Sequence, residues 1–183
     1  YSIPYWSDGY FDVDAQGRMC ALPHGPGGPV LPLMVKYLFT SEKLSVQVHP
    51  SDAQAPAGER GKEECWLVLA AEPDARLAIG FREPIDGEAM HAAALDGSIE
   101  HLLEWHPVQP GDFFYLPAGT VHAIGPGLAL IEIQQNSDIT YRLYDYGRPR
   151  ELHLDDGVAV SQAVPYPPAL HRHVDFVTDQ MLV

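Results

Sequence analysis

The chain has 183 residues, of which 46% are hydrophobic, and this size and composition favour one globular unit with a single core. Eleven Lys and Arg residues against 25 Asp and Glu residues give a formal net charge of -14, which argues against binding to nucleic acid or to anionic membranes. An anionic small-molecule substrate would therefore need a local basic patch.

Membrane insertion and a disulfide framework are also disfavoured. No apolar run approaches the ~20 residues that span a bilayer, and the first residues lack the charged start and apolar core of a signal peptide. Cys20 and Cys65 are too few for a disulfide framework, and Cys65 falls in an apolar strand where a buried thiol is expected. We therefore expect a reducing, cytoplasmic setting. Because the sequence begins with Tyr1 rather than Met, a fragment is one interpretation.

Short strands dominate the predicted elements. The 16 glycines and 17 prolines, spread between short apolar runs, are typical of many turns. In chain order we expect a hairpin within 10–22 and strands at 33–39, 44–49, 63–69, 76–81, 103–108, 112–116, 128–135 and 139–144. Two short helices within 85–103, broken near Asp96-Gly97, and one at 154–161 complete the set. This order predicts a mainly β fold, either a sandwich or a barrel.

The stretch from Gly111 to His122 combines a strand with a tight turn and ends on a histidine. Gly111-Asp112 closes one turn, residues 113–116 favour a strand, and the Pro-Ala-Gly sequence at 117–119 forces a second turn. Taken alone, this histidine is readily explained by packing.

Residues of metal-ligand type also lie upstream. Because alternate side chains on a strand share a face, Gln47 and His49 are expected to project to one side. By the same rule, Glu64, Trp66 and Val68 are expected to share one face of the strand at 63–69. With Glu64 and His122, the Gln47 and His49 pair forms a set of imidazole, carboxylate and amide groups that suits a divalent ion of the zinc, iron or manganese kind. A half-buried polar pair on a strand is the alternative for Gln47 and His49. The other histidines lack such neighbours, and His171-Arg172-His173 is expected to be a solvated stretch.

These motifs resemble those of the cupins. Gly111-x5-Pro117-x-Gly119-x2-His122 is similar to the second cupin motif, and Gln47-x-His49 with Glu64 is similar to the first. Within the cupins, residues 44–50 (LSVQVHP), 61–66 (GKEECW), 132–138 (EIQQNSD) and 141–145 (YRLYD) resemble class I mannose-6-phosphate isomerases.

The resemblance runs from about Leu31 to about Val160 and implies a cupin jelly-roll β-sandwich or barrel with a few short helices. We expect a lead segment at 1–28, a cupin metal-binding domain at 29–155, and a short helix with a Pro-rich tail at 156–183. Family members normally carry a second cupin-like domain, so the tail is interpreted either as the truncated start of that domain or as the end of a short form.

The resemblance also implies roles for individual residues. Gln47, His49, Glu64 and His122 match the family's metal ligands, usually for zinc, although other divalent metals are compatible with them. These ligands form an open site with room for water or a substrate oxygen.

A second group of residues matches the family's substrate and catalytic positions. Lys62, Asp138 and Arg142 match polar residues associated with substrate and catalysis, and Glu132 matches a carboxylate discussed as an acid or base. The alternatives are that Lys62 and Arg142 are surface charges and that Glu132 is their structural partner.

The implied reaction interconverts mannose 6-phosphate and fructose 6-phosphate by moving a proton between C1 and C2 through an enediol or enediolate. Lys62, Glu132 and Asp138 are all candidates for the base. Arg142 is the expected phosphate ligand because a guanidinium holds phosphate oxygens in a fork, and Ser51 would add a hydroxyl donor. Two alternatives are a cupin dioxygenase or decarboxylase and a non-catalytic sugar-phosphate-binding cupin. The sequence indicates no oligomeric state.

Overall fold

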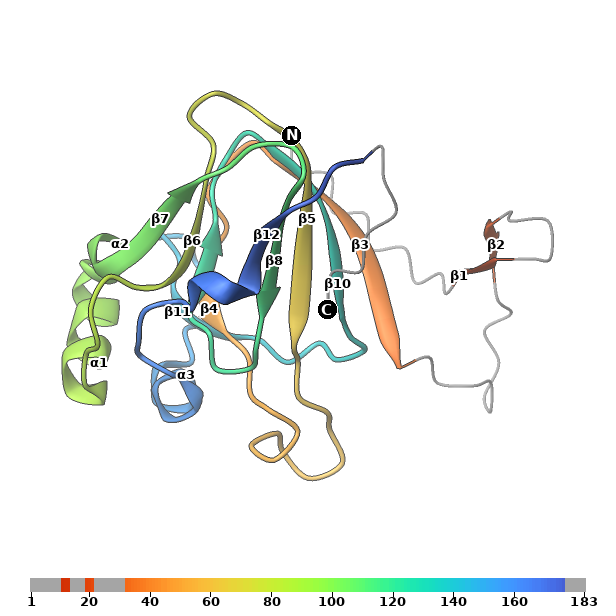
Figure 1. Cartoon of the computed structure of the whole chain (residues 1–183). Helices are drawn as coiled ribbons and strands as arrows, with labels where there is room; N and C mark the ends of the chain where they lie inside the picture. The colour runs from red at the N-terminus through yellow and green to blue at the C-terminus, as the bar shows by residue number, and fades with distance from the viewer. Residues whose placement is uncertain (1–10, 14–18, 22–31, 177–183) are drawn as a thin grey trace.

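The computed structural model describes residues 11–13, 19–21 and 32–176, and its strands form two five-stranded antiparallel sheets that pack face to face (Figure 1). Sheet I has the order β12 (His171–His173), β8 (Asp112–Leu116), β5 (Glu64–Ala71), β10 (Leu128–Gln135) and β3 (Leu33–Thr40). Sheet II has the order β11 (Tyr141–Tyr144), β4 (Val46–Val48), β9 (His122–Ile124), β6 (Arg76–Phe81) and β7 (Leu103–Pro107). This arrangement confirms the predicted β-sandwich. The predicted N-terminal hairpin corresponds to β1 (Phe11–Val13) and β2 (Met19–Ala21), which pair antiparallel.

The main core lies between the two sheets, and burial in this core determines which face of each strand points inward. Large buried side chains of sheet I interdigitate with those of sheet II, as expected for two sheets whose inner faces alternate with polar outer positions. This inner core comprises Trp66, Val68, Phe114, Leu116, Leu128 and Leu130 of sheet I and Leu77, Ile79 and Ile124 of sheet II, with Ala75 and Tyr166 beside them.

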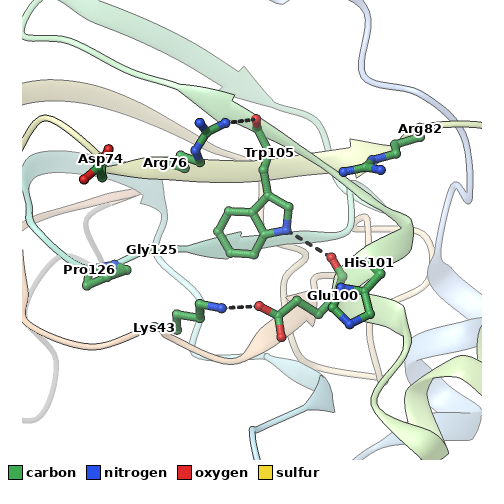
Figure 2. A pocket seen from close by; sticks show the side chains of 9 residues that line it. All are labelled: Lys43, Asp74, Arg76, Arg82, Glu100, His101, Trp105, Gly125 and Pro126. Atoms are coloured by element: carbon green, nitrogen blue, oxygen red, sulfur yellow. Dashed lines mark hydrogen bonds and ion pairs between the residues drawn. The ribbon is translucent and has the colours of Figure 1, made fainter.

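A second core lies on the outer face of sheet II, beneath α1 (Gly87–Asp96), α2 (Ile99–Leu102) and α3 (Leu154–Val160). The predicted helix break is confirmed: α1 begins after Asp86, whose carboxylate accepts a hydrogen bond from the backbone N–H of Ala89, and ends at Gly97 with φ +82°. Trp105 packs at the edge of this outer core and lines a cavity between α2 and β7 (Figure 2).

Edge strand β3 shows why a charged side chain enters the sandwich. Its outward residues are exposed and apolar: Leu33, Val35, Tyr37 and Phe39. Because side chains alternate across a strand, the residues between them face inward. Lys36 therefore points into the sandwich, where it lies opposite Glu132 of β10, and Glu132 in turn lies opposite Trp66 of β5.

Three elements were not expected from the sequence: β9, the 3₁₀ turn Pro168–Leu170 and β12. The stretch at 171–173 is exposed, as predicted, but it also forms strand β12, which pairs with β8. There, Nε2 of His171 and Nδ1 of His173 lie 3.5 Å and 3.1 Å from Oδ1 of Asp112. The pairing depends on the exposed edge of β8, which local pattern does not reveal.

The expectation of a buried Cys65 is wrong, because the thiol is only half-buried. On β5 the inward positions belong to Glu64, Trp66 and Val68, as predicted, so Cys65 lies on the outer face. In the part of the chain that the structure describes, no helix is long and apolar enough to cross a membrane.

Candidate metal centre

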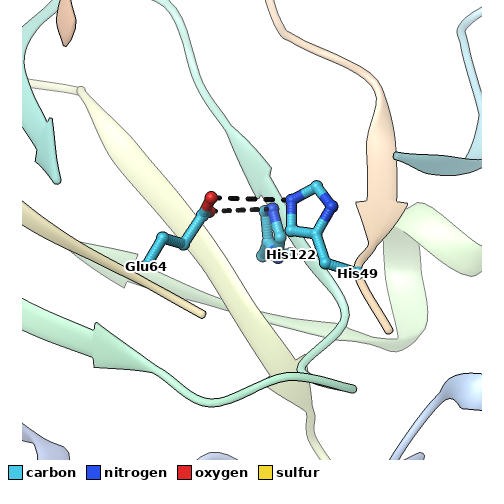
Figure 3. A group of neighbouring side chains, drawn as sticks. All are labelled: His49, Glu64 and His122. Carbon is cyan, nitrogen blue, oxygen red and sulfur yellow. Dashed lines mark ion pairs between the residues drawn. The ribbon is translucent and has the colours of Figure 1, made fainter. Parts of the chain in front are cut away.

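Three side chains from separate strands meet in the interior at one end of the sandwich (Figure 3). His49 directly follows β4, Glu64 begins β5 and His122 begins β9, and all three are at most 3% exposed. One potential ligand atom from each lies within 4.8 Å of the others. The two Glu64 oxygens face different rings, with Oε2 3.5 Å from Nε2 of His49 and Oε1 3.3 Å from Nε2 of His122.

Backbone carbonyls orient both imidazoles. Nδ1 of His49 donates to the carbonyl of Ile139 at 2.8 Å, and Nδ1 of His122 donates to the carbonyl of Thr120 at 2.9 Å. Since a carbonyl only accepts, each Nδ1 carries the proton and each neutral ring keeps its lone pair on Nε2. This is the arrangement in which histidine binds a metal.

Most ligand atoms of the cluster are buried without hydrogen-bond partners among the described residues. Nε2 of His49 and both carboxylate oxygens of Glu64 have none, because their contacts with each other and with Lys62 are ion-pair distances that lack hydrogen-bond geometry. Unpaired buried polar atoms are costly and rare in folded proteins. Two imidazole nitrogens and a carboxylate converging in this way fit a divalent cation.

The titration behaviour of the cluster is consistent with that role. Burial lowers the pKa of His122 to about 4, and burial together with the charge of Lys62 lowers the pKa of His49 well below its ordinary value. Burial and the nearby Glu132 carboxylate raise the pKa of Glu64 to about 7. The imidazoles are therefore neutral at physiological pH, and a cation beside Glu64 would favour its ionised form.

Gln47 lies at the edge of the cluster. It pairs across sheet II with His122 on one side and with Arg142 on the other. Its Nε2 lies 3.3 Å from Nε2 of His122, and its Oε1 accepts a hydrogen bond from the hydroxyl of Ser45 at 3.4 Å. The amide oxygen is the only atom of this side chain that binds cations.

Lys62 is buried beside the cluster, which excludes its interpretation as a surface charge. Its Nζ lies 3.3 Å from Oε2 of Glu64. Two contacts close the preceding loop and hold the lysine in place: the Lys62 N–H donates to the carbonyl of Pro50 at 2.9 Å, and the Gly61 N–H donates to Oδ1 of Asp52 at 2.8 Å.

Glu132 is a buried carboxylate, and each of its two oxygens accepts a hydrogen bond. Nε1 of Trp66 donates to Oε2 at 3.2 Å and Nζ of Lys36 donates to Oε1 at 3.1 Å. Burial alone would raise the pKa of Glu132, but the charges of Lys62 and Lys36 outweigh it and lower the pKa. Glu132 is therefore ionised.

The sequence analysis missed Lys36 and Trp66 as members of this polar network. The signal available for Lys36 was its position in a run of seven otherwise uncharged strand residues, where a lone cation on the inward face needs a buried partner. Trp66 was placed on the Glu64 face but was not connected with Glu132.

Arg142 lies on β11, next to Gln47 in the sheet register. Its Nη1 donates to the carbonyl of Glu151 at 2.9 Å, whereas its Nε is buried with no hydrogen-bond partner among the described residues. The guanidinium thus retains an unsatisfied donor.

Two predicted site residues are not brought into contact with the cluster. Asp138 is exposed, and within the described residues no hydrogen bond or ion pair links its carboxylate to His49, Glu64 or His122. The hydroxyl of Ser51 donates instead to Oε1 of Gln54 at 2.7 Å, within its own loop.

Comparison with known proteins finds relatives that are named mannose-6-phosphate isomerases, although no protein-family model matches the chain. It is 44% identical over 153 residues to the mannose-6-phosphate isomerase ManA of Bacillus subtilis, a match that covers 79% of this chain and 48% of the relative. It is 45% identical over 139 residues to the mannose-6-phosphate isomerase of Streptococcus mutans, covering 72% of this chain and 44% of the relative.

The solved structures that resemble this chain carry the same kind of name as the sequence relatives. The crystal structure of the mannose 6-phosphate isomerase from Bacillus subtilis superposes with a TM-score of 0.70 at 37% identity, covering 77% of this chain and 48% of that one. A putative mannosephosphate isomerase from Archaeoglobus fulgidus shares the fold, with a TM-score of 0.66 at 24% identity. The chain spans about half the length of the relatives it matches. By sequence and by fold, the chain is similar to mannose-6-phosphate isomerases.

Proposed function

We propose that this chain carries the catalytic metal centre of an isomerase that interconverts mannose 6-phosphate and fructose 6-phosphate. The observation that carries the proposal is the buried group of His49, Glu64 and His122, whose ligand atoms converge while those of His49 and Glu64 lack hydrogen-bond partners among the described residues. The relatives that match this chain at 44% and 45% identity are named for that activity. Sugar phosphates are metabolites of the cytoplasm, which is the location we propose.

Zinc is the proposed metal. Nε2 of both histidines and the Glu64 carboxylate would hold it, and Gln47 would complete the set through its amide oxygen. Mixed nitrogen and oxygen ligands of this kind suit zinc, which in catalytic sites keeps a position open. When bound, a divalent cation polarises the sugar carbonyl and stabilises the negative charge of the enediolate.

Glu132 and Lys62 are the proposed proton-transfer pair. The reaction needs a group that accepts a proton from one carbon and returns it to the next. Glu132 is suited to accept it because Lys36 and Trp66 hold its carboxylate in the ionised form. Lys62, 3.3 Å from Glu64, is placed to neutralise oxygen charge beside the cluster.

The remaining predicted residues are proposed as substrate contacts. Arg142 has an unsatisfied buried Nε and is the proposed phosphate ligand. Ser51 and Asp138 lie on loops outside the cluster, so their roles would require contact with the sugar phosphate itself rather than with the metal ligands.

A coupled assay for fructose 6-phosphate formed from mannose 6-phosphate, with and without chelator, tests the proposal. We expect turnover that chelator abolishes and zinc restores. His122→Ala should lose both zinc and turnover, whereas His91→Ala, which changes a histidine of α1 that faces Asp155 of α3, should keep both.

A His122→Ala protein with full zinc content would contradict the ligand assignment. Sugar-phosphate binding without turnover in the zinc-loaded protein would instead identify a binding protein, and oxygen consumption would identify a dioxygenase.

A further inference from the structure

The cavity beside Trp105 opens on the outer face of sheet II and is distinct from the metal cluster (Figure 2). Its volume is about 430 Å³, which is within the range of pockets that hold small metabolites. Trp105 lies at its centre, with Arg76 on one side and Lys43 on the other. The residues come from β6 and the segments on either side of it, from β7 and α2, and from the loops that precede β4 and β10.

Sheet II separates this cavity from the metal cluster. Trp105 pairs with Ala78, and Ala78 pairs with Ala123, so these three side chains share the outer face. His122 precedes Ala123 on β9 and therefore projects to the inner face. A ligand in the cavity would contact none of the cluster side chains.

Specific contacts hold the walls of the cavity in place. Nε1 of Trp105 donates to the carbonyl of Glu100 at 3.0 Å, and Nη1 of Arg76 donates to the carbonyl of Trp105 at 3.4 Å. The Gly125 N–H donates to the carbonyl of Arg76 at 3.0 Å. A Cβ on Gly125 would lie 2.4 Å from that carbonyl oxygen, so only glycine allows this close approach.

The charges in the cavity are unevenly compensated. Lys43 forms an ion pair with Glu100 and its Nζ lies 5.5 Å from the centre of the Trp105 ring, so its charge is largely matched. Among the described residues, by contrast, no carboxylate lies within ion-pair distance of Arg76. In a chain with a net charge of -14, an arginine without such a partner inside a cavity favours an anionic ligand.

We propose that this cavity is a second binding site, independent of the metal centre, for a small phosphorylated sugar. The apolar face of a sugar ring would pack against Trp105, its phosphate would bind the guanidinium of Arg76, and its hydroxyls would donate to the carboxylates of Asp74 and Glu100. The site does not depend on the proposed isomerase activity, because it contains no residue of the metal cluster.

Calorimetry with mannose 6-phosphate tests the proposal in a chelator-treated Arg142→Ala protein, in which both the metal and the phosphate contact of the first site are removed. We expect about one equivalent to bind, with a change in tryptophan fluorescence. Adding Arg76→Gln should weaken this binding at least about tenfold, the usual scale for one charge-assisted contact. Adding Arg172→Gln, which changes an exposed arginine on β12, should leave it unchanged.

Equal binding in the two double variants, or no binding in the Arg142→Ala protein, would overturn the proposal. Inorganic phosphate binding as tightly as mannose 6-phosphate would overturn its sugar component. Failure here is separable from failure of the isomerase proposal, which is measured by turnover of the zinc-loaded protein.

Discussion

Arg142 shares sheet II with Gln47 and His122, two of the proposed metal ligands, but makes different contacts. Arg142 is one strand away from Gln47 and two from His122, and no hydrogen bond or ion pair within the described residues joins its guanidinium to the cluster. Its proposed partner is therefore the substrate phosphate rather than the metal site.

We expect Arg142→Ala to raise KM for mannose 6-phosphate about tenfold or more while zinc content stays unchanged, because a guanidinium contact with phosphate is lost. Steady-state kinetics and metal analysis provide the measurements. Arg172→Gln serves as the matched control on an exposed strand. Parallel loss of zinc and substrate affinity would contradict the assignment.

Lys62 offers a second test at the level of a single side chain. Methionine has nearly the same length and no charge, so Lys62→Met should fit the buried space while removing the ion pair with Glu64. We expect zinc to be retained and kcat to fall about 10²-fold or more, the usual scale for a proton-transfer group. Unchanged kcat in a zinc-loaded variant would exclude Lys62 from the chemistry.

At the scale of elements, the loop between β4 and β5 positions the buried lysine. Gly61 lets two stretches of backbone meet, since a Cβ there would lie 2.3 Å from the backbone nitrogen of Asp52. The next residue, Lys62, donates its backbone N–H to the carbonyl of Pro50. The loop is therefore closed by backbone packing.

Gly61→Ala should lower the free energy of unfolding by about 2–3 kcal/mol, because the backbone on both sides must move apart. The matched control is Gly58→Ala, where φ is +90° but nothing lies within 4 Å. That change should cost only about 1 kcal/mol through backbone strain. Denaturant unfolding measures both, and equal losses would show that the close approach at Gly61 contributes nothing.

At the scale of the whole molecule, the metal centre joins the two sheets. Glu64 belongs to sheet I, whereas His49 and His122 belong to the strands of sheet II or their ends. A cation held between them would cross-link the sandwich at that end and bind only to the folded state.

Zinc at about 1,000 times its Kd should therefore stabilise the fold by about 4 kcal/mol. For a chain of 183 residues this corresponds to a rise in Tm of about 8–16 °C. Differential scanning calorimetry with and without chelator checks the shift. His122→Ala should show almost none of it, and a full shift in that variant would place the stabilising metal elsewhere.

Local pattern alone was sufficient for most strands and for the orientation of their side chains. Alternation correctly placed Glu64, Trp66 and Val68 on one face. Glycine at position 97 correctly marked the break between the first two helices. These features depend on residues close in sequence, and so they can be predicted without knowledge of the fold.

The tertiary structure alone decided which side chains meet. Lys36 and Glu132 are 96 residues apart and come together through the register of β3 and β10, which no local signal specifies. The same dependence on distant pairing explains β12, which pairs with β8. The sequence by itself determined the strands and the ligand-type residues, whereas sheet pairing determined their partners, because register joins residues that are remote along the chain.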